Sequence, residues 1–383
     1  MSLVDQEQIL EEHRHYLSDG ARIECFRRAI REVVHKGDVV LDLGAGTGIM
    51  GLLACEAGAS RVYAIEEGAI IGLARSVCRA NGFQDRVIFI KDFSTRASLP
   101  ELVDVAVSDQ IGHFGFEAGL LDYASDLRQR FLKPEGRMVP ASLQLWLAPV
   151  ESPASYERVR FWRQSPAGFD FLPAAALAAN TAYSFQSSPG EILADPGCAA
   201  ALDLRKVCAT PFCLETTLTA RRAGMVDGIA GWFSAQLSPS VVMTNSPLVE
   251  GRINRLNLYL PIEKPLAVEA GCEIFITLQI HPLDGMMRWS LERQGSGLPL
   301  ERVMHSTFRG MHVCEEDLEK TRPQHVPTLT PRGSARLGAL RMFDGVNSVQ
   351  DIEQAVWSEN RGTFRSQAEA AAFVAELVLR NSN

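Results

Sequence analysis

The sequence predicts a chain of three parts: a doubly wound α/β domain, an antiparallel β domain and a small helical extension. Three observations support this prediction. Up to about residue 140, short apolar runs alternate with helical segments, and from residue 141 shorter segments alternate apolar and polar residues. A proline-containing linker at 322–331 then precedes segments with helical periodicity. Apolar runs joined by helices indicate a parallel sheet, whereas strict alternation indicates antiparallel sheet.

We place the first domain at residues 1–140. Four apolar runs are of strand length and lie between helical segments. The predicted strands are 39–43, 61–65, 87–91 and 103–108, and the predicted helices are 22–35, 49–57 and 69–81. This alternation predicts a parallel sheet with helices on both faces.

The second domain, 141–321, is predicted to be an antiparallel barrel or sandwich. Its predicted strands are 142–148, 212–220, 227–237, 255–260 and 272–280. An alanine-rich stretch, Phe171–Ala182, indicates a helical arm inserted at about 156–190. The third domain, 332–383, is predicted to be helical, with helices at 335–343, 348–357 and 366–379. Ser348 is the expected N-cap of the middle helix, with Asp351 at its third position.

The composition disfavours several classes of partner. The 383 residues are 46% hydrophobic and 22% charged, as expected of a soluble globular protein with more than one domain. The net charge of −8 disfavours a nucleic-acid surface, and no apolar run approaches the roughly 20 residues of a membrane span. The N-terminus is polar, which disfavours a secretory signal. Eight cysteines without a CxxC pair predict a reduced, cytoplasmic protein that uses cysteine as a small apolar residue, with no metal site.

The most informative stretch is the glycine-rich turn after the first strand, Leu41–Gly48, which reads LDLGAGTG. A chain that leaves a strand, turns sharply and approaches a ligand with its backbone needs glycine, because glycine allows positive φ and close contact. Glu66 ends the second strand, where a carboxylate can accept hydrogen bonds from both hydroxyls of a ribose. Both features are compatible with a dinucleotide, but the GxG spacing and the preceding Asp42 are more typical of a methyltransferase.

The ordered set of motifs resembles the protein arginine methyltransferase family over about residues 13–315. The matching stretches are HYLSDGAR (15–22), VLDLGAGTG (40–48), AIEEGAI (64–70), IKDFS (90–94) and FLKPEGRMVPA (131–141). Shorter matches continue through the second domain at 161–162, 168–170, 211–214 and 271–275.

The resemblance implies a Rossmann-like domain that binds S-adenosyl-L-methionine and yields S-adenosyl-L-homocysteine, a β-barrel, and an arm that forms a homodimer. It assigns the cofactor carboxylate to Arg22, the ribose to Glu66 and the adenine to Asp92 and Phe93. The full set of expected cofactor-binding residues is Arg22, Asp42, Gly44, Ala45, Gly46, Glu66, Asp92 and Phe93.

The loop after the fourth strand departs from the family pattern. The family has two glutamates there, which orient a guanidinium bidentately and position one nitrogen to attack the methyl group. Here Asp109 replaces the first glutamate and Ala118 stands at the position of the second, with Glu117 one residue earlier. We take Asp109 and Glu117 as the candidate catalytic residues. Either the loop bulges to bring Glu117 inward, or the clamp is half missing.

Two further positions leave alternatives open. The family's Thr-His-Trp motif aligns with Ile253–Asn254–Arg255. Arg255 either places positive charge at the acceptor site, which disfavours a cationic substrate, or is solvated on a strand face. His113 either acts as a general base or fills the space of an aromatic residue, and Phe114 and Phe116 are expected to pack.

The C-terminal helices loosely resemble small domains that deliver precursor peptides to modifying enzymes, and a plain helical appendage is the alternative. The function expected from the resemblance is methyl transfer to a protein, a peptide or a smaller molecule. The competing hypothesis is a catalytically silent binding or scaffold protein that keeps the fold. No nucleic acid, membrane or metal is expected as a partner.

Overall fold

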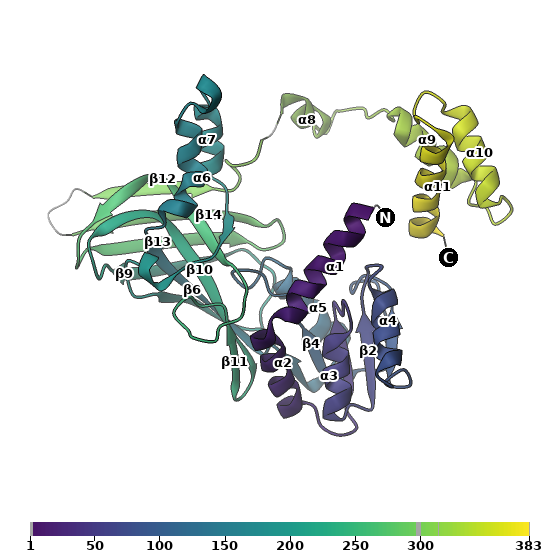
Figure 1. Cartoon of the computed structure of the whole chain (residues 1–383), viewed down its shortest axis with the longest axis horizontal. Coiled ribbons are helices and arrows are strands. Elements are labelled where there is room, and N and C mark those ends of the chain that lie inside the picture. Colours follow the sequence, from purple (N-terminus) through teal and green to yellow (C-terminus); the bar gives the residue numbers. More distant parts are fainter. Residues whose placement is uncertain (1–2, 296–299, 313, 383) are drawn as a thin grey trace. The chain divides into compact units, whose positions relative to one another are not determined.

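The computed structural model of the chain describes residues 3–295, 300–312 and 314–382. The described residues form two compact units, one of residues 8–312 and one that combines 3–7 with 314–382. The larger unit contains the parallel sheet (purple and blue in Figure 1) and the antiparallel sheets (green). The outermost residues of the predicted terminal domains, 1–2 and 383, lie outside the described part.

The parallel sheet has the strand order β3-β2-β1-β4-β5. Its strands are β1 (Val39–Leu43), β2 (Arg61–Ile65), β3 (Val87–Ile90), β4 (Val103–Ser108) and β5 (Leu132–Val139). Every residue of β1 is buried, which explains its uninterrupted apolar sequence. The predicted Rossmann-like, doubly wound fold is confirmed. Its order reverses between β1 and β4, and ligands of such sheets bind at that point, beyond the carboxyl ends of the strands.

Helices connect these strands. They are α1 (Leu3–Ser18), α2 (Gly20–Val33), α3 (Ile49–Ala57), α4 (Ile71–Ala80) and α5 (Leu120–Arg130). The side chain of Asp19 caps α2 by accepting a hydrogen bond from the backbone N–H of Arg22. Helix α5 was not predicted, although Leu120, Leu121, Ala124 and Leu127 form its buried face at helical spacing.

The following domain consists of two antiparallel sheets. One has the order β7-β12-β10-β6-β8 with β11 paired to β10, and the other has the order β15-β14-β13-β9. The first sheet contains β6 (Ser142–Val150), β7 (Tyr183–Phe185), β8 (Gly197–Asp203), β10 (Gly224–Ser238), β11 (Val241–Thr244) and β12 (Asn257–Val268). The second contains β9 (Phe212–Thr219), β13 (Glu273–His281), β14 (Met286–Gln294) and β15 (Glu301–Ser306).

All five predicted antiparallel strands are present, but several boundaries were wrong: β10 spans Gly224–Ser238 instead of 227–237, and β12 spans Asn257–Val268 instead of 255–260. Strand β12 begins at Asn257, so Arg255 lies in the preceding loop and not on a strand face. Strands β7, β8, β11, β14 and β15 were not predicted. In β14 the alternation was present, since exposed Arg288 lies between buried Met287 and Trp289, but a charged residue, Arg293, occupies a buried position near its end.

The arm leaves the antiparallel domain after β6. It comprises α6 (Pro153–Arg160) and α7 (Leu172–Ala179), which lie together above the sheet in Figure 1. The backbone N–H of Ser152 donates a hydrogen bond of 2.6 Å to buried Asp227 of β10 and so anchors the start of the arm. Val159 and Ala179 are buried between its helices, whereas Phe169 at the turn between them is 69% exposed.

The C-terminal unit contains α8 (Glu315–Lys320), α9 (Pro331–Arg341), α10 (Val349–Glu359) and α11 (Gln367–Asn381). Helices α9, α10 and α11 share a small core of their own, made of Ala335, Ala339, Ile352, Val356, Phe364, Ala370, Phe373, Val374 and Leu377. The predicted capping box is present, because Ser348 and Asp351 exchange hydrogen bonds. No described helix is both long and apolar enough to cross a membrane.

No disulfide joins the eight cysteines, all of which lie in the described part of the chain. The prediction that they serve as buried apolar residues holds for Cys55, Cys78 and Cys272. It was wrong for the three cysteines of the antiparallel domain that are exposed, Cys198, Cys208 and Cys213. Two of these lie on β8 and β9, where alternate side chains of a strand face solvent.

Candidate cofactor and acceptor site

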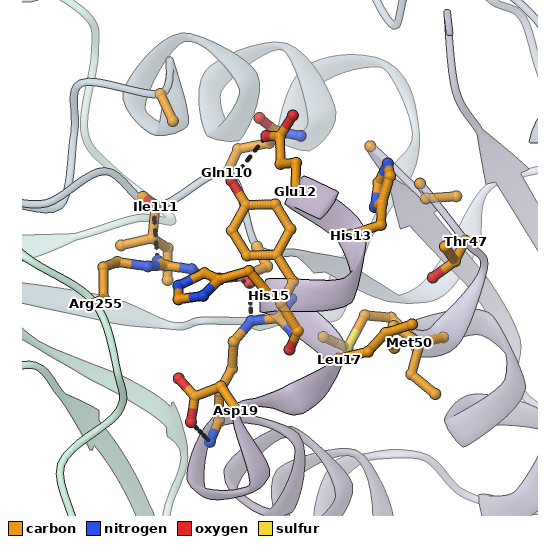
Figure 2. Close-up of a pocket in the computed structure, with 18 of the residues that line it drawn as sticks. Glu12, His13, His15, Leu17, Asp19, Thr47, Met50, Gln110, Ile111 and Arg255 are labelled. Carbon is orange, nitrogen blue, oxygen red and sulfur yellow. Dashed lines mark hydrogen bonds and ion pairs between the residues drawn. The ribbon is translucent and has the colours of Figure 1, made fainter. Parts of the chain in front are cut away.

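A cavity of about 740 Å³ opens at the carboxyl ends of β1, β2 and β4. Its walls come from α1, the glycine turn, the loop after β4 and the loop before β12. Figure 2 shows residues of α1, such as Glu12 and His13, with Thr47 and Met50 on one side and Ile111 and Arg255 on the other. The cavity therefore lies where the parallel sheet meets the antiparallel domain.

The glycine turn has the backbone that its sequence predicts. Gly44, Gly46 and Gly48 have φ angles of +74°, +54° and +81°, which side chains disfavour. A Cβ atom on Gly46 would lie 2.7 Å from Cε1 of His13, so α1 packs directly on the turn. Gly44, Ala45 and Gly46 all line the cavity, as expected of cofactor-binding residues.

Glu66 lies at the end of β2 and faces the same turn. Its Oε2 accepts a hydrogen bond of 3.0 Å from the backbone N–H of Gly46, and its Oε1 accepts one of 2.7 Å from that of Gly68. A carboxylate has about four acceptor positions, so both oxygens keep the capacity to accept a further hydrogen bond. This arrangement suits a ligand with two neighbouring hydroxyl groups.

A smaller cavity of about 110 Å³ adjoins the first, and Gly44 and Glu66 line both. Asp92 and Phe93 contribute to its wall. Phe93 is 49% exposed, and Oδ1 of Asp92 accepts the backbone N–H of Phe93 at 2.8 Å. The structure therefore brings these two predicted residues next to Glu66, with the guanidinium carbon of Arg96 4.6 Å from the centre of the half-exposed Phe93 ring.

Asp42 also lines the large cavity, but its carboxylate is hydrogen-bonded to the protein backbone. Its Oδ2 accepts the backbone N–H of Gly51 at 2.8 Å, which ties the end of β1 to α3. The side chain is 1% exposed. Loss of hydration raises the pKa of Asp42 to about 7, against the opposing effect of the Gly51 hydrogen bond.

Arg22 is buried at the cavity wall and is paired with Asp109. Nε and Nη2 of Arg22 each lie 2.5 Å from Oδ2 of Asp109, and Nη1 donates to the carbonyl of Tyr16 at 3.1 Å. Both side chains are about nine-tenths buried, with 8% and 10% exposure. The arginine predicted to hold a cofactor carboxylate and the aspartate predicted to orient the acceptor are thus in direct contact.

A second guanidinium reaches the same aspartate. Nη2 of Arg255 lies 3.2 Å from Oδ2 of Asp109, and its Nη1 donates to the carbonyl of Ile111 at 2.8 Å. Figure 2 shows the side chain extending to Ile111 inside the cavity. The Arg255 side chain is 10% exposed, which overturns the alternative of a solvated arginine.

The loop after β4 does bring Glu117 to the cavity. The loop folds back on itself, so that Oε1 of Glu117 accepts the backbone N–H of Phe114 at 2.8 Å. The side chain is exposed, and it lines the cavity. Surrounding protein atoms raise the pKa of Glu117 to about 7, opposed by backbone hydrogen bonds and by Arg255.

His113 lines the cavity beside Glu117. Burial and the nearby charge of Arg255 lower the pKa of His113, opposed by a hydrogen bond to the Leu256 backbone, so the imidazole is neutral at pH 7. Phe114 and Phe116 are buried and contact each other edge to face, as predicted for packing residues.

Sequence reasoning missed two contributors from α1 and the loop before β12. The hydroxyl of Tyr16 donates to Glu12 at 2.9 Å at the cavity wall. The backbone N–H of Asn254 donates to Asp19 at 2.7 Å, which joins the antiparallel domain to the start of α2. The spacing of four between Glu12 and Tyr16 on a helix was a usable signal for the first contact, whereas nothing local indicated the second.

The raised pKa of Asp42 predicts a pH dependence of stability. Between its ordinary value of 3.8 and about 7, the folded state holds a proton that the unfolded state has released. The free energy of unfolding should therefore fall as pH rises from 5 to 7, by up to about 1.4 kcal/mol per pH unit from this group. Asp42→Asn keeps an acceptor for Gly51 and should show a smaller decline in urea unfolding at the two pH values. An equal decline in both proteins would contradict the assignment.

Comparisons with known proteins agree with this geometry. Residues 141–294 match the family model described as the arginine methyltransferase oligomerization subdomain. A protein of Arabidopsis thaliana named "Probable protein arginine N-methyltransferase 6" is 32% identical over 240 residues, which cover 59% of this chain and 54% of that protein. Protein arginine N-methyltransferase 6 of Xenopus laevis is 28% identical over 287 residues, 71% of this chain and 84% of its own length. The chain spans about half the length, or less, of the first curated relatives it matches.

Solved structures show the same fold. Protein arginine methyltransferase 10 of Arabidopsis thaliana superposes with a TM-score of 0.68 at 24% identity, covering 78% of this chain and 98% of that one. The Trypanosoma brucei PRMT1 enzyme-prozyme heterotetrameric complex, solved with AdoHcy, gives 0.69 at 22% identity and covers 77% and 97%. The chain therefore shares the fold of protein arginine methyltransferases, and its residues 141–294 match the oligomerization subdomain of that family.

Proposed function

We propose that the chain is a methyltransferase that uses S-adenosyl-L-methionine. The observation that supports this most directly is the position of Glu66, whose two oxygens face the glycine turn and can each accept another hydrogen bond. The residues around it suit a nucleoside: a backbone free of side chains at Gly44 and Gly46, and the exposed ring of Phe93 in the adjoining cavity. The relatives are named as methyltransferases, and one structural neighbour was solved with AdoHcy.

In this proposal the predicted cofactor residues keep their roles. Glu66 binds the ribose, Asp92 and Phe93 the adenine, and Arg22 the carboxylate of the amino-acid end. Asp42 acts indirectly, because its hydrogen bond to Gly51 holds β1 and α3 at the spacing that forms the turn. When bound, the cofactor supplies a methyl group on a sulfonium, which needs no protein nucleophile.

The acceptor end of the cavity positions the attacking group. Asp109 is held by Arg22 and Arg255 and cannot swing freely, so it gives that end a fixed geometry. Glu117 faces the cavity with a raised pKa, so it can hold or release a proton near neutral pH. We assign both as the catalytic residues. The acceptor is a group on a protein or peptide, and a small molecule is the alternative.

A Glu66 variant tests cofactor binding. Glu66→Ala removes the predicted ribose contacts and the hydrogen bonds to Gly46 and Gly68, and two lost hydrogen bonds to a charged group weaken binding by roughly 100- to 10,000-fold. Calorimetry with S-adenosylhomocysteine measures the effect. Glu135→Gln, an exposed carboxylate of β5, is the control and should bind like the unchanged protein.

If the unchanged protein binds neither S-adenosylmethionine nor S-adenosylhomocysteine, the proposal is wrong. If it binds them but transfers no methyl group to any protein, peptide or small molecule, the scaffold hypothesis replaces it. Transfer that is lost on Asp109→Ala would rule the scaffold hypothesis out.

We further propose that the chain forms a homodimer through its arm. Phe161 and Phe169 expose 45% and 69% of their surface there, and the matched family model is an oligomerization subdomain. Light scattering at micromolar concentration should report twice the chain mass of 42.0 kDa, and Phe169→Asp should lower that value. A 42.0 kDa species for the unchanged protein would contradict the proposal.

A further inference from the structure

The acceptor end of the cavity already contains a guanidinium that belongs to the chain itself. Arg255 pairs with Asp109 and donates to the carbonyl of Ile111, and its guanidinium carbon lies 5.9 Å from the centre of the Phe233 ring. These contacts hold it from three directions. An arginine substrate would need the same carboxylate, Asp109, for bidentate recognition.

The charges at this end also disfavour a cationic acceptor. Asp109 carries one negative charge and contacts two guanidiniums, those of Arg22 and Arg255, so the three groups sum to one positive charge. The protein around the exposed Glu117 carboxyl raises its pKa to about 7, so part of it is protonated at neutral pH, and the pKa of His113 is lowered. A bound cofactor would place its carboxylate on Arg22, as proposed above, which leaves Arg255 paired with Asp109 and adds the positive charge of the sulfonium nearby.

Most of the other carboxylates that line the cavity accept hydrogen bonds. Asp19 accepts the backbone N–H groups of Arg22 and Asn254, and Glu12 accepts the hydroxyl of Tyr16. Glu66 and Asp42 belong to the glycine-turn end, where they contact backbone N–H groups, and Glu67 follows Glu66 in the cavity wall. Among the described residues, Asp109 is the carboxylate that contacts both Arg22 and Arg255.

We propose that Arg255 makes the acceptor site select a carboxylate of a protein or peptide instead of a guanidinium. This rests on the proposed methyltransferase function. A guanidinium has five N–H donors in a planar fork that matches a carboxylate. The hydrogen bonds described for Arg255 use Nη1 once, for Ile111, and Nη2 twice, for the two oxygens of Asp109, so Nε and the second N–H of Nη1 remain as donors for a ligand. Arg255 thus acts as a specificity-determining residue.

Methyl transfer to a carboxylate is a single displacement at the methyl carbon. An oxygen of the carboxylate attacks the methyl carbon, the new C–O bond forms as the C–S bond breaks, and the electron pair of that bond stays on sulfur. The products are a methyl ester and a neutral thioether. No proton is released, because the carboxylate is already ionised at neutral pH. A protonated Glu117 can donate a hydrogen bond to the second oxygen, whereas transfer to a guanidinium requires a base.

The test uses the full-length protein, S-adenosylmethionine with a labelled methyl group, and a peptide mixture from a pepsin-digested cell lysate, which offers every side chain. A methyl ester is hydrolysed by mild base and releases volatile labelled methanol, whereas methylated arginine is stable to base. The variants are Arg255→Gln, Arg255→Lys, which keeps the positive charge, and Arg221→Gln as a control. Arg221 is a 69% exposed arginine that pairs with Asp195.

We expect base-labile label from the unchanged protein and from Arg221→Gln. Arg255→Gln should lower it by about 10- to 100-fold, the range for a lost hydrogen bond to a charged group, and Arg255→Lys by less. Calorimetry with S-adenosylhomocysteine shows that each variant is folded. Base-stable label in methylarginine, equal labelling by Arg255→Gln, or no label despite a bound cofactor would each overturn the inference. Absence of cofactor binding in the unchanged protein is a different outcome, which overturns the proposed function itself.

Discussion

The contact of Asp109 with two arginines is the interaction on which the site depends. Arg22 comes from α2, Asp109 from the end of β4 and Arg255 from the loop before β12, so one carboxylate links the sheet domain to the antiparallel domain. All three side chains are about nine-tenths buried. Breaking a buried ion pair by removing one partner costs about 3–5 kcal/mol, because the other charge is left without compensation. The cavity walls are therefore fixed relative to each other by charge as well as by packing.

The two ends of the cavity are built on different principles. At the glycine turn, backbone groups and one carboxylate form the surface, and the absence of a Cβ at Gly44 and Gly46 lets the side chains of Gln110 and His13 approach the backbone closely. At the acceptor end, charged side chains meet. The pKa of Glu117 is raised and the pKa of His113 is lowered, so both shifts favour the uncharged form of the side chain. The first end suits a fixed ligand such as a nucleoside. The second end determines which nucleophile can approach it.

Much of the architecture could be predicted because its signals are local. The buried strand β1 is an apolar run, the turn is marked by three glycines, and Ser348 and Asp351 form the capping box that their spacing indicates. Strand β14 and helix α5 also carry local signals that were overlooked, because β14 alternates apolar and polar residues from Met287 to Glu292 and the apolar spacing of α5 is regular.

The site was harder to predict where it depends on distant contacts. Sequence placed Asp109, Glu117 and Arg255 near one another only through the family resemblance, and could not decide which way Glu117 or Arg255 points. The direction of Glu117 is set by a hydrogen bond from the backbone of Phe114. The direction of Arg255 depends on its contact with Asp109, which lies 146 residues away in the sequence. Contacts between segments so far apart leave no periodic trace in the sequence.

A crystal structure of the chain with S-adenosylhomocysteine tests the central claim most directly. The account predicts that the ribose hydroxyls lie on Glu66 and that the guanidinium of Arg255 still contacts Asp109 and Ile111, beside the sulfur atom. An Arg255 side chain turned out to solvent, with Asp109 open to the cavity, would contradict it.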